Sequence, residues 1–240
     1  MRGVDAVLHA ATLHKPHVAT HARQDFVDTN VTGTLNLLER RSPRGVRAFV
    51  FTSTTSAFGR RADAAAGAPA AWITEDVVPV PKNIYGVTKV AAEDLCELFQ
   101  RNQRPAVHRA AHVALLSRER RRSDGARDAY ADANLKANEF LYRRVDIEDV
   151  VDAHLLAIEQ APAARLRPLH HQRHDAVHAR RPARAAHATR RRSCARRVPG
   201  VRGRMRARGW SMLPGIDRVY VNERARARAR LAAAPRLRRA

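Results

Sequence analysis

The chain has 240 residues and a formal net charge of +22, from 45 Lys and Arg against 23 Asp and Glu. A chain of this length can bury one sizeable hydrophobic core or two small ones. The sequence shows neither a signal-peptide pattern nor an apolar run of membrane length, and Cys96 and Cys194 form no pair motif. We therefore expect a protein of the reducing cytoplasm without a membrane partner or a disulfide framework.

The positive charge lies almost entirely in the last third of the chain. Residues 163–240 hold 23 Lys and Arg against three Asp and Glu, which is +20 of the total of +22. Residues 163–208 contain no Phe, Tyr, Trp, Ile or Lys. High charge with few large apolar residues predicts disorder, because too little surface can be buried to offset chain entropy. Residues 209–222 have the composition of ordinary folded protein.

Regular elements are predicted in the first hundred residues. Residues 4–11 predict a short buried strand that ends in small residues, and residues 48–51 predict a second strand. Residues 26–39 predict a helix between them, and a further helix is predicted from Tyr85 to Phe99. The apolar stripe of the first helix consists of Val27, Val31, Leu35 and Leu38. The order strand, helix, strand, helix indicates an α/β fold with a parallel sheet.

Tyr85 and Lys89 are four residues apart, so they share one face of the second predicted helix. An unperturbed phenol, with a pKa of about 10, is a poor base at neutral pH, but a nearby cation favours the phenolate. The pair can then act as general acid or base on a carbonyl/alcohol pair. In parallel sheets, ligands bind beyond the carboxyl ends of the strands, where Ala10, Ala11 and residues 52–55 are expected.

Four segments of the sequence form a pattern in a fixed order. They are Val7-Leu8-His9-Ala10-Ala11, residues 30–38, residues 51–59, and Tyr85-Gly86-Val87-Thr88-Lys89. Together they resemble the extended short-chain dehydrogenase/reductase family, the NAD-dependent epimerases and dehydratases of nucleotide sugars. Residues 145–158 resemble a later stretch of that family, with Asp149 at the position of its aspartate. The resemblance implies a partial Rossmann-like parallel sheet with flanking helices, followed by a largely irregular or disordered Arg-rich C-terminal region.

The resemblance also implies roles for individual residues. Tyr85 is the acid/base, and Lys89 holds the nicotinamide ribose and lowers the pKa of Tyr85. Thr54 binds the reacting oxygen, with the neighbouring Thr55 as an alternative, and Asn30 braces the sheet. The residues expected at the site of the cofactor, NAD or NADP, are Ala10, Ala11, Thr52, Ser53, Tyr85 and Lys89. The expected partner is a small sugar-type substrate, and the family pattern is compatible with a homodimer.

The chain departs from the family pattern in two respects. No Gly-rich turn of the GxxGxxG kind, which binds the cofactor pyrophosphate at a helix N-terminus, precedes residue 4. We therefore expect weak cofactor binding and impaired activity. Arg-rich blocks, at residues 40–44, 60–66, 104–125 and in the tail, suggest out-of-frame translation of a GC-rich gene. A single clean reading frame in the nucleotide sequence, without compensating insertions or deletions, would contradict that hypothesis.

These features predict four regions. They are residues 1–103, the C-terminal part of a dinucleotide-binding domain; 104–125, an anomalous segment in place of a strand and a cofactor-side loop; 126–162, a remnant of the substrate part; and 163–240, a disordered tail. Two other functions remain open. The basic tail could bind nucleic acid without sequence preference, or the chain could be a non-catalytic pseudoenzyme.

No metal site is expected. His14, His17 and His21 have helical spacing, but they lack acidic or thiolate companions in a fixed pattern, so a solvated face is favoured. The same holds for four histidines of the tail, His170, His171, His174 and His178. Asp149 is interpreted as a carboxylate at a helix start.

Overall fold

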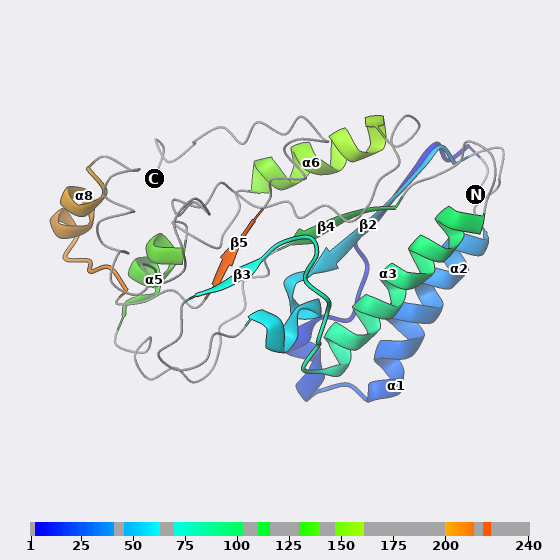
Figure 1. Ribbon diagram of the computed structural model, residues 1–240, viewed down its shortest axis with the longest axis horizontal. Helices are drawn as coiled ribbons and strands as arrows, with labels where there is room; N and C mark the ends of the chain where they lie inside the picture. Colours follow the sequence, from blue (N-terminus) through cyan, green and yellow to red (C-terminus); the bar gives the residue numbers. More distant parts are fainter. Residues whose placement is uncertain are drawn as a thin grey trace.

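The centre of the structure is a three-stranded parallel sheet. The computed structural model describes residues 3–40, 46–62, 70–102, 110–115, 130–139, 147–160, 200–213 and 218–221. The strands are β1 (Ala6–His9), β2 (Ala48–Thr54) and β4 (Ala110–Leu115), in the order β1-β2-β4. Leu8 pairs with Val50, and Val50 pairs with Ala111, so β2 is the central strand. The predicted parallel α/β arrangement is confirmed (Figure 1).

Helices cover both faces of this sheet. One face carries α1 (Arg23–Phe26), the π-helical turn η2 (Val27–Thr32), α2 (Gly33–Glu39) and α3 (Ile84–Asn102), and α6 (Ile147–Gln160) lies on the other (Figure 1). Two adjacent residues of β2 demonstrate this. Ser53 bonds to Glu93 of α3, whereas Thr52 bonds to His154 of α6. Successive side chains of a strand point to opposite faces, so α3 and α6 lie on opposite sides of β2.

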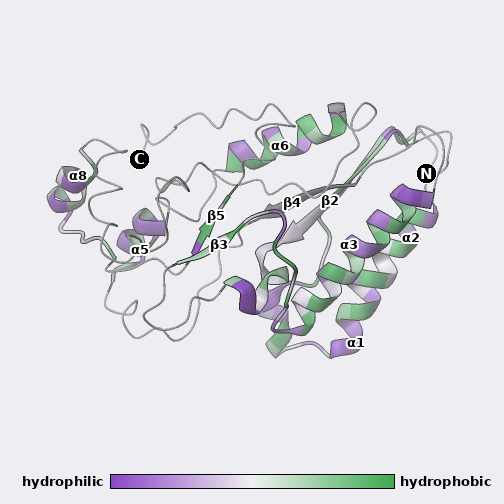
Figure 2. Ribbon diagram, viewed as in Figure 1, coloured by the Kyte–Doolittle hydropathy of each residue, from purple (hydrophilic) through white to green (hydrophobic). Residues whose placement is uncertain are grey.

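A hydrophobic core lies between β2 and the helices α2 and α3. Its buried members are Leu38, Phe49, Phe51, Ala92 and Cys96. Ala92 and Cys96 are one helical turn apart, which puts both on the face of α3 that meets the sheet. Figure 2 shows apolar and polar residues alternating around α3, as expected for a helix with one face against a sheet.

The first helical segment differs from its prediction in the face that it buries. The fully buried side chains are Phe26, Asn30, Thr34 and Leu38, so of the predicted stripe only Leu38 is buried and the others are partly buried. Polar side chains can lie on this face because Asn30 and Thr34 make hydrogen bonds there. The predicted burial of the first strand is also wrong in part. Leu8 of β1 is 48% exposed, and β1 is an edge strand among the described residues.

A second, smaller sheet pairs distant parts of the chain. β3 (Ala71–Ile73) is parallel to β5 (Arg218–Tyr220), with Trp72 opposite Val219. Two short turns follow β2, η3 (Thr55–Ala57) and η4 (Gly59–Ala62). Phe58, between the two turns, and Ala62, at the end of η4, pack against this smaller sheet. The C-terminal end of β2 therefore leads directly into the segment that packs against the smaller sheet.

Three further helices complete the described structure. They are η1 (Lys15–Ala19), a 3₁₀ turn after β1, and the short helices α5 (Asp132–Glu139) and α8 (Val201–Ala207). None of the described helices is long and apolar enough to cross a membrane.

Two expectations about the Arg-rich segments are wrong where the structure describes them. Residues 104–125 were expected to replace a strand, but Ala110–Leu115 form β4 by backbone pairing with β2. Residues 163–208 were expected to lack regular structure, but Val201–Ala207 form α8. This short helix is stable in its context because Val201 and Met205 share one face and pack with Met212. Apart from Gly200 and Arg208, which flank α8, the other residues of both segments lie outside the described ones.

Candidate active site

The N-terminal turn of α3 is held tightly against the end of β2. The Asn83 side chain accepts a hydrogen bond from the backbone N–H of Gly86 at 3.0 Å, in the manner of a helix N-cap. A Cβ atom at Gly86 would lie 2.7 Å from the backbone oxygen of Ser56. Only glycine permits this approach, which holds the first turn of α3, and with it Tyr85 and Lys89, against the end of β2. Tyr85 is 3% exposed and Lys89 is 1% exposed.

Lys89 is held by the backbone of β2. Its Nζ donates a hydrogen bond to the backbone oxygen of Thr52 at 2.7 Å and lies 3.9 Å from the centroid of the Phe51 ring. Burial lowers the pKa of Lys89 to about 8, although the nearby Glu93 and Cys96 act in the opposite direction. The ammonium form therefore still predominates at neutral pH, and it is stabilised by a carbonyl and a ring face rather than by bulk water.

Glu93 joins Lys89 to the same strand. It lies one turn after Lys89 on α3, and its carboxylate accepts a hydrogen bond from the Ser53 hydroxyl. Ser53 was predicted at the cofactor site, and its side chain is directed to α3 in the structure. The result is a small polar cluster of Thr52, Ser53, Lys89 and Glu93 at the carboxyl end of the central strand.

The two candidate hydroxyls that follow have different positions. Thr54 is the last residue of β2 and is 3% exposed, and its Oγ1 accepts a hydrogen bond from the Ser56 N–H at 3.1 Å. This leaves its own proton to donate to another oxygen. Thr55 is partly buried at the start of η3. Both stay candidates for the residue that binds a reacting oxygen.

The residues just after the carboxyl end of β1 are exposed. Ala10 and Ala11 follow the strand directly and are both exposed, as a site for a ligand at this edge requires. His9, just before them, is buried, and its Nε2 lies 2.8 Å from Thr34 Oγ1. Thr34 donates its hydroxyl proton to the backbone oxygen of Asn30, so His9 Nε2 is the donor in the bond between His9 and Thr34. Burial, together with the charge of Lys89, lowers the pKa of His9 to about 4, and the ring is neutral at pH 7.

Asn30 joins the segment after β1 to α3. Its Oδ1 accepts hydrogen bonds from Thr12 Oγ1 and the Leu13 N–H, both at 2.8 Å, and its Nδ2 donates to Thr88 Oγ1 at 3.0 Å. Asn30 was expected to brace the sheet, but its side chain instead joins the loop after β1 to α3. Thr88 precedes Lys89, so Asn30 helps to fix the turn of α3 that carries the Tyr85/Lys89 pair.

The histidines after β1 are not arranged as a metal site. The His14 ring lies against Tyr85, with centroids 4.9 Å apart, and the His17 and His21 rings are 5.1 Å apart. Among the described residues, no group of three or more His, Cys, Asp or Glu side chains could hold a metal ion. The four histidines of the tail lie outside the described residues.

Two contributors were missed by the sequence analysis. Glu93 could have been found, because its spacing of four residues from Lys89 puts both on one helix face. His154 could not, because its contact with Thr52 joins residues 102 positions apart across the sheet. Asp149, predicted at a helix start, does lie in the first turn of α6.

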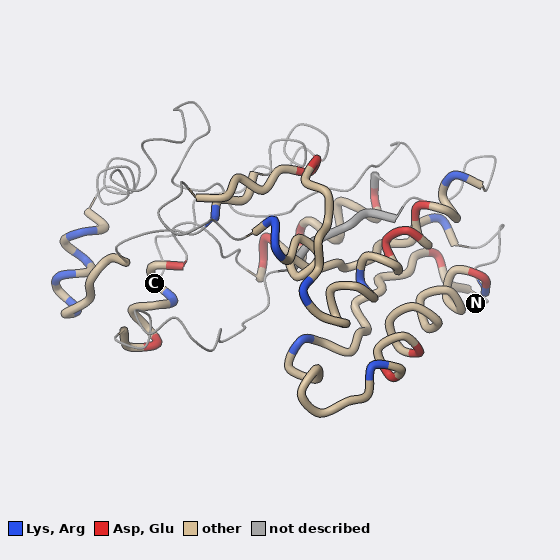
Figure 3. The backbone as a smooth tube through the Cα atoms, turned by 60° about the horizontal axis from the view of Figure 1, so that its bottom comes forward, with Lys and Arg blue, Asp and Glu red and all other residues tan. Residues whose placement is uncertain are grey.

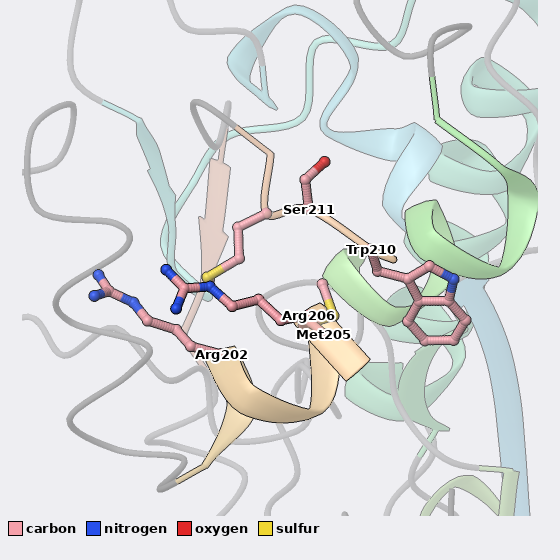
Figure 4. A pocket seen from close by; sticks show the side chains of 6 residues that line it. Arg202, Met205, Arg206, Trp210 and Ser211 are labelled. Carbon is pink, nitrogen blue, oxygen red and sulfur yellow. The ribbon is translucent and has the colours of Figure 1, made fainter. Parts of the chain in front are cut away.

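A separate hollow lies far from this cluster. It has a volume of about 380 Å³ and is lined by α8 and the residues after it, among them Arg202, Arg206 and Trp210 (Figure 4). α8 is at the opposite end of the molecule from α3 (Figure 1). Figure 3 shows that α8 carries Lys/Arg and no Asp/Glu. The hollow therefore does not belong to the Tyr85/Lys89 site.

Comparisons with known proteins agree with the geometry. The model of the NAD dependent epimerase/dehydratase family matches residues 1–166. UDP-glucose 4-epimerase 2 of Oryza sativa subsp. japonica is 35% identical over 92 residues, which are 38% of this chain and 21% of that protein. GDP-6-deoxy-D-mannose reductase of Pseudomonas aeruginosa is 37% identical over 93 residues, which are 38% of this chain and 29% of the reductase. The matched part thus spans less than a third of these relatives.

Solved structures share the fold. The UDP-glucuronic acid 4-epimerase from Bacillus cereus, in complex with UDP-glucuronic acid and NAD, superposes with a TM-score of 0.56 at 17% identity, covering 96% of this chain and 70% of the epimerase. MoeE5, in complex with UDP-glucose and NAD, gives 0.56 at 19% identity, covering 97% of this chain and 75% of MoeE5. Because the family model covers well over half of the sequence, the chain belongs to the NAD dependent epimerase/dehydratase family.

Proposed function

We propose that this protein acts as an NAD(P)-dependent epimerase, dehydratase or reductase on the sugar of a nucleotide sugar. One observation carries the proposal most. Tyr85 and Lys89 share the buried face of α3, and the Lys89 ammonium is held 2.7 Å from the Thr52 carbonyl oxygen, at the carboxyl end of the central parallel strand. The relatives named above, which are nucleotide-sugar epimerases and a GDP-sugar reductase, support the substrate class.

In this proposal Tyr85 moves the proton. The fixed cation one turn away favours the phenolate of Tyr85, which can then take a proton from a sugar hydroxyl and return it to the carbonyl that forms. Thr54, or its neighbour Thr55, donates a hydrogen bond to the same sugar oxygen. Lys89 stays protonated throughout, because its pKa of about 8 lies above neutral pH.

The described residues fit the nicotinamide end of the cofactor. Lys89 has three N–H donors, and the Thr52 carbonyl accepts from one of them, so the ammonium retains donors suited to ribose hydroxyls. The exposed residues Ala10 and Ala11 lie at the end of the adjacent strand. When bound, the nicotinamide ring supplies the acceptor and donor of hydride. The role of this chain is then to orient that ring and to handle the proton.

Calorimetric titration of the purified chain with NAD⁺ and NADP⁺ tests binding, and conversion of UDP- and GDP-sugars tests turnover. Tyr85→Phe is expected to abolish turnover while leaving cofactor affinity within a few-fold, because the phenol oxygen serves proton transfer. Tyr130→Phe is the matched control, since Tyr130 packs in the separate cluster beside β3 and β5. Full turnover by Tyr85→Phe would contradict the assignment, and tight cofactor binding would contradict the expected weak binding.

The remaining expectations stay predictions. Nonspecific nucleic-acid binding concerns residues 163–240, most of which lie outside the described ones, and no described contact favours it. The pseudoenzyme alternative is decided by the same turnover assay. The four predicted regions, the cytoplasmic location and the homodimer are likewise open to direct measurement.

A further inference from the structure

Thr52 is contacted from both faces of the sheet. On the α3 side, its backbone oxygen accepts the hydrogen bond from Lys89 Nζ at 2.7 Å. On the α6 side, its Oγ1 lies 2.9 Å from His154 Nε2. The backbone and the side chain of this one residue therefore join two helices that lie on opposite faces of the sheet.

The direction of the hydrogen bond between Thr52 and His154 follows from the bond that the other ring nitrogen of His154 makes. His154 Nδ1 lies 2.8 Å from the backbone oxygen of Val150, and a carbonyl oxygen can only accept. Nδ1 therefore carries the proton. In the neutral ring Nε2 is then an acceptor, and the Thr52 hydroxyl donates to it. The ring is oriented by its own helix and in turn orients the Thr52 side chain.

A fixed Thr52 side chain limits rotation of the residue that presents the carbonyl to Lys89. This matters because Lys89 is 1% exposed, so little water is available to replace that acceptor. Its other close contact is the ring face of Phe51, the preceding residue of the same strand. Any tilt of β2 at Thr52 would weaken both contacts with the ammonium.

We propose that His154 is a positioning residue for Lys89, acting across the central strand through Thr52. The proposal rests on the proposed function for the importance of Lys89, but the coupling itself is a property of this chain alone. His154 touches neither substrate nor cofactor in this arrangement. Its effect reaches the site only through the Thr52 hydroxyl, so removing that hydroxyl should have the same consequence as removing the imidazole.

Titration of Lys89 measures this coupling directly. The chain has four lysines, Lys15, Lys82, Lys89 and Lys136, so ¹³C-lysine labelling gives a simple NMR spectrum in which Lys89→Arg assigns the Lys89 signal. Glu93, Cys96 and His9 have charge interactions with Lys89, and Tyr85 lies one turn away on the same helix; none of these residues is altered in the variants below.

His154→Phe and Thr52→Val are each expected to lower the Lys89 titration midpoint by about 0.5 unit or more, because the ammonium loses part of its acceptor. The double variant should shift it no further than either single one, since both break the same link. His154→Gln retains an acceptor and Thr52→Ser retains a hydroxyl. Both should therefore keep the Lys89 titration midpoint close to that of the wild type. Glu159→Gln, an exposed change on α6, is the control.

A merely structural role for His154 would lower the melting temperature and leave the Lys89 midpoint unchanged, and that result would overturn the proposal. If His154→Phe does not fold, the comparison of Thr52→Val with Thr52→Ser decides the question alone. Failure of every variant and of the wild type to bind NAD(H) would count against the proposed function. The lysine titration would still decide the coupling.

Discussion

Lys89 is expected to destabilise the fold at neutral pH, and Lys89→Met should therefore stabilise it. The pKa of Lys89 falls from 10.5 to about 8 because the ammonium is buried. At about 1.36 kcal/mol per pKa unit, the folded protein carries a cost of about 3 kcal/mol for keeping this group charged. Such a cost is expected where a charge is retained for binding or chemistry.

The pH dependence gives the sharper form of this prediction. The unfolded chain holds the proton up to pH 10.5, but the folded chain holds it only up to about pH 8. Between these values the unfolded state binds more protons, so the wild type gains stability as pH rises, by about 3 kcal/mol in total. The Met variant lacks this gain. The excess stability of Lys89→Met should thus be full below pH 8 and be lost towards pH 10.5.

Urea unfolding of both proteins at pH 7, 8, 9 and 10 measures the difference. Lys82→Met, at an exposed lysine just before α3, is the matched control for loss of a lysine. Calorimetric titration of the same variants with the cofactor should show the opposite effect. Lys89→Met should weaken cofactor binding, and Lys82→Met should not. A stability difference between wild type and Lys89→Met that stays constant across this pH range would refute the account of Lys89 burial.

Two further predictions concern the packing around this site. Gly86→Ala should destabilise the fold by about 1–3 kcal/mol in urea unfolding, because its Cβ would lie 2.7 Å from the Ser56 oxygen. Gly203→Ala on α8 meets nothing within 4 Å and should be neutral or stabilising by up to about 1 kcal/mol; equal effects at both glycines would disprove the close contact. His9→Gln, which can still donate to Thr34, should remove a stability loss of about 3 kcal/mol that the wild type shows as pH falls from 6.5 to about 4. The neutral buried ring must gain a proton there, and parallel pH profiles of wild type and variant would contradict it.

The predicted elements of the first hundred residues agree with the structure because their signals are local. The helix from Tyr85 begins one residue earlier, at Ile84, and continues to Asn102. The strand at residues 48–51 extends to Thr54. Such differences of a few residues are expected, since the ends of helices and strands fray and are the least sharply defined parts of an element. The parallel pairing followed from the alternation of strands and helices.

The misjudged elements have a different cause. Asn30 and Thr34 are polar, so a hydropathy stripe passes over them, yet they are buried on the inner face of the first helical segment. Their partners are Thr88 and His9, far away in sequence. α8 was missed because its composition is strongly basic, whereas its two apolar residues suffice once Met212 packs on them. For Asn30 and Thr34 the deciding partner lies outside any local window, 58 and 25 positions away in sequence.

The spacing of Tyr85 and Lys89 was determined by the sequence alone, because two residues four apart must share a face of whatever helix they form. The sequence also determined the order of β1, the first helical segment, β2 and α3. Only the tertiary structure decided that this face is buried, that Lys89 is held by the Thr52 carbonyl, and that His154 reaches the same residue from the other side. Those contacts depend on sheet register and on which helix packs on which face, and both arise from interactions between residues up to 102 positions apart.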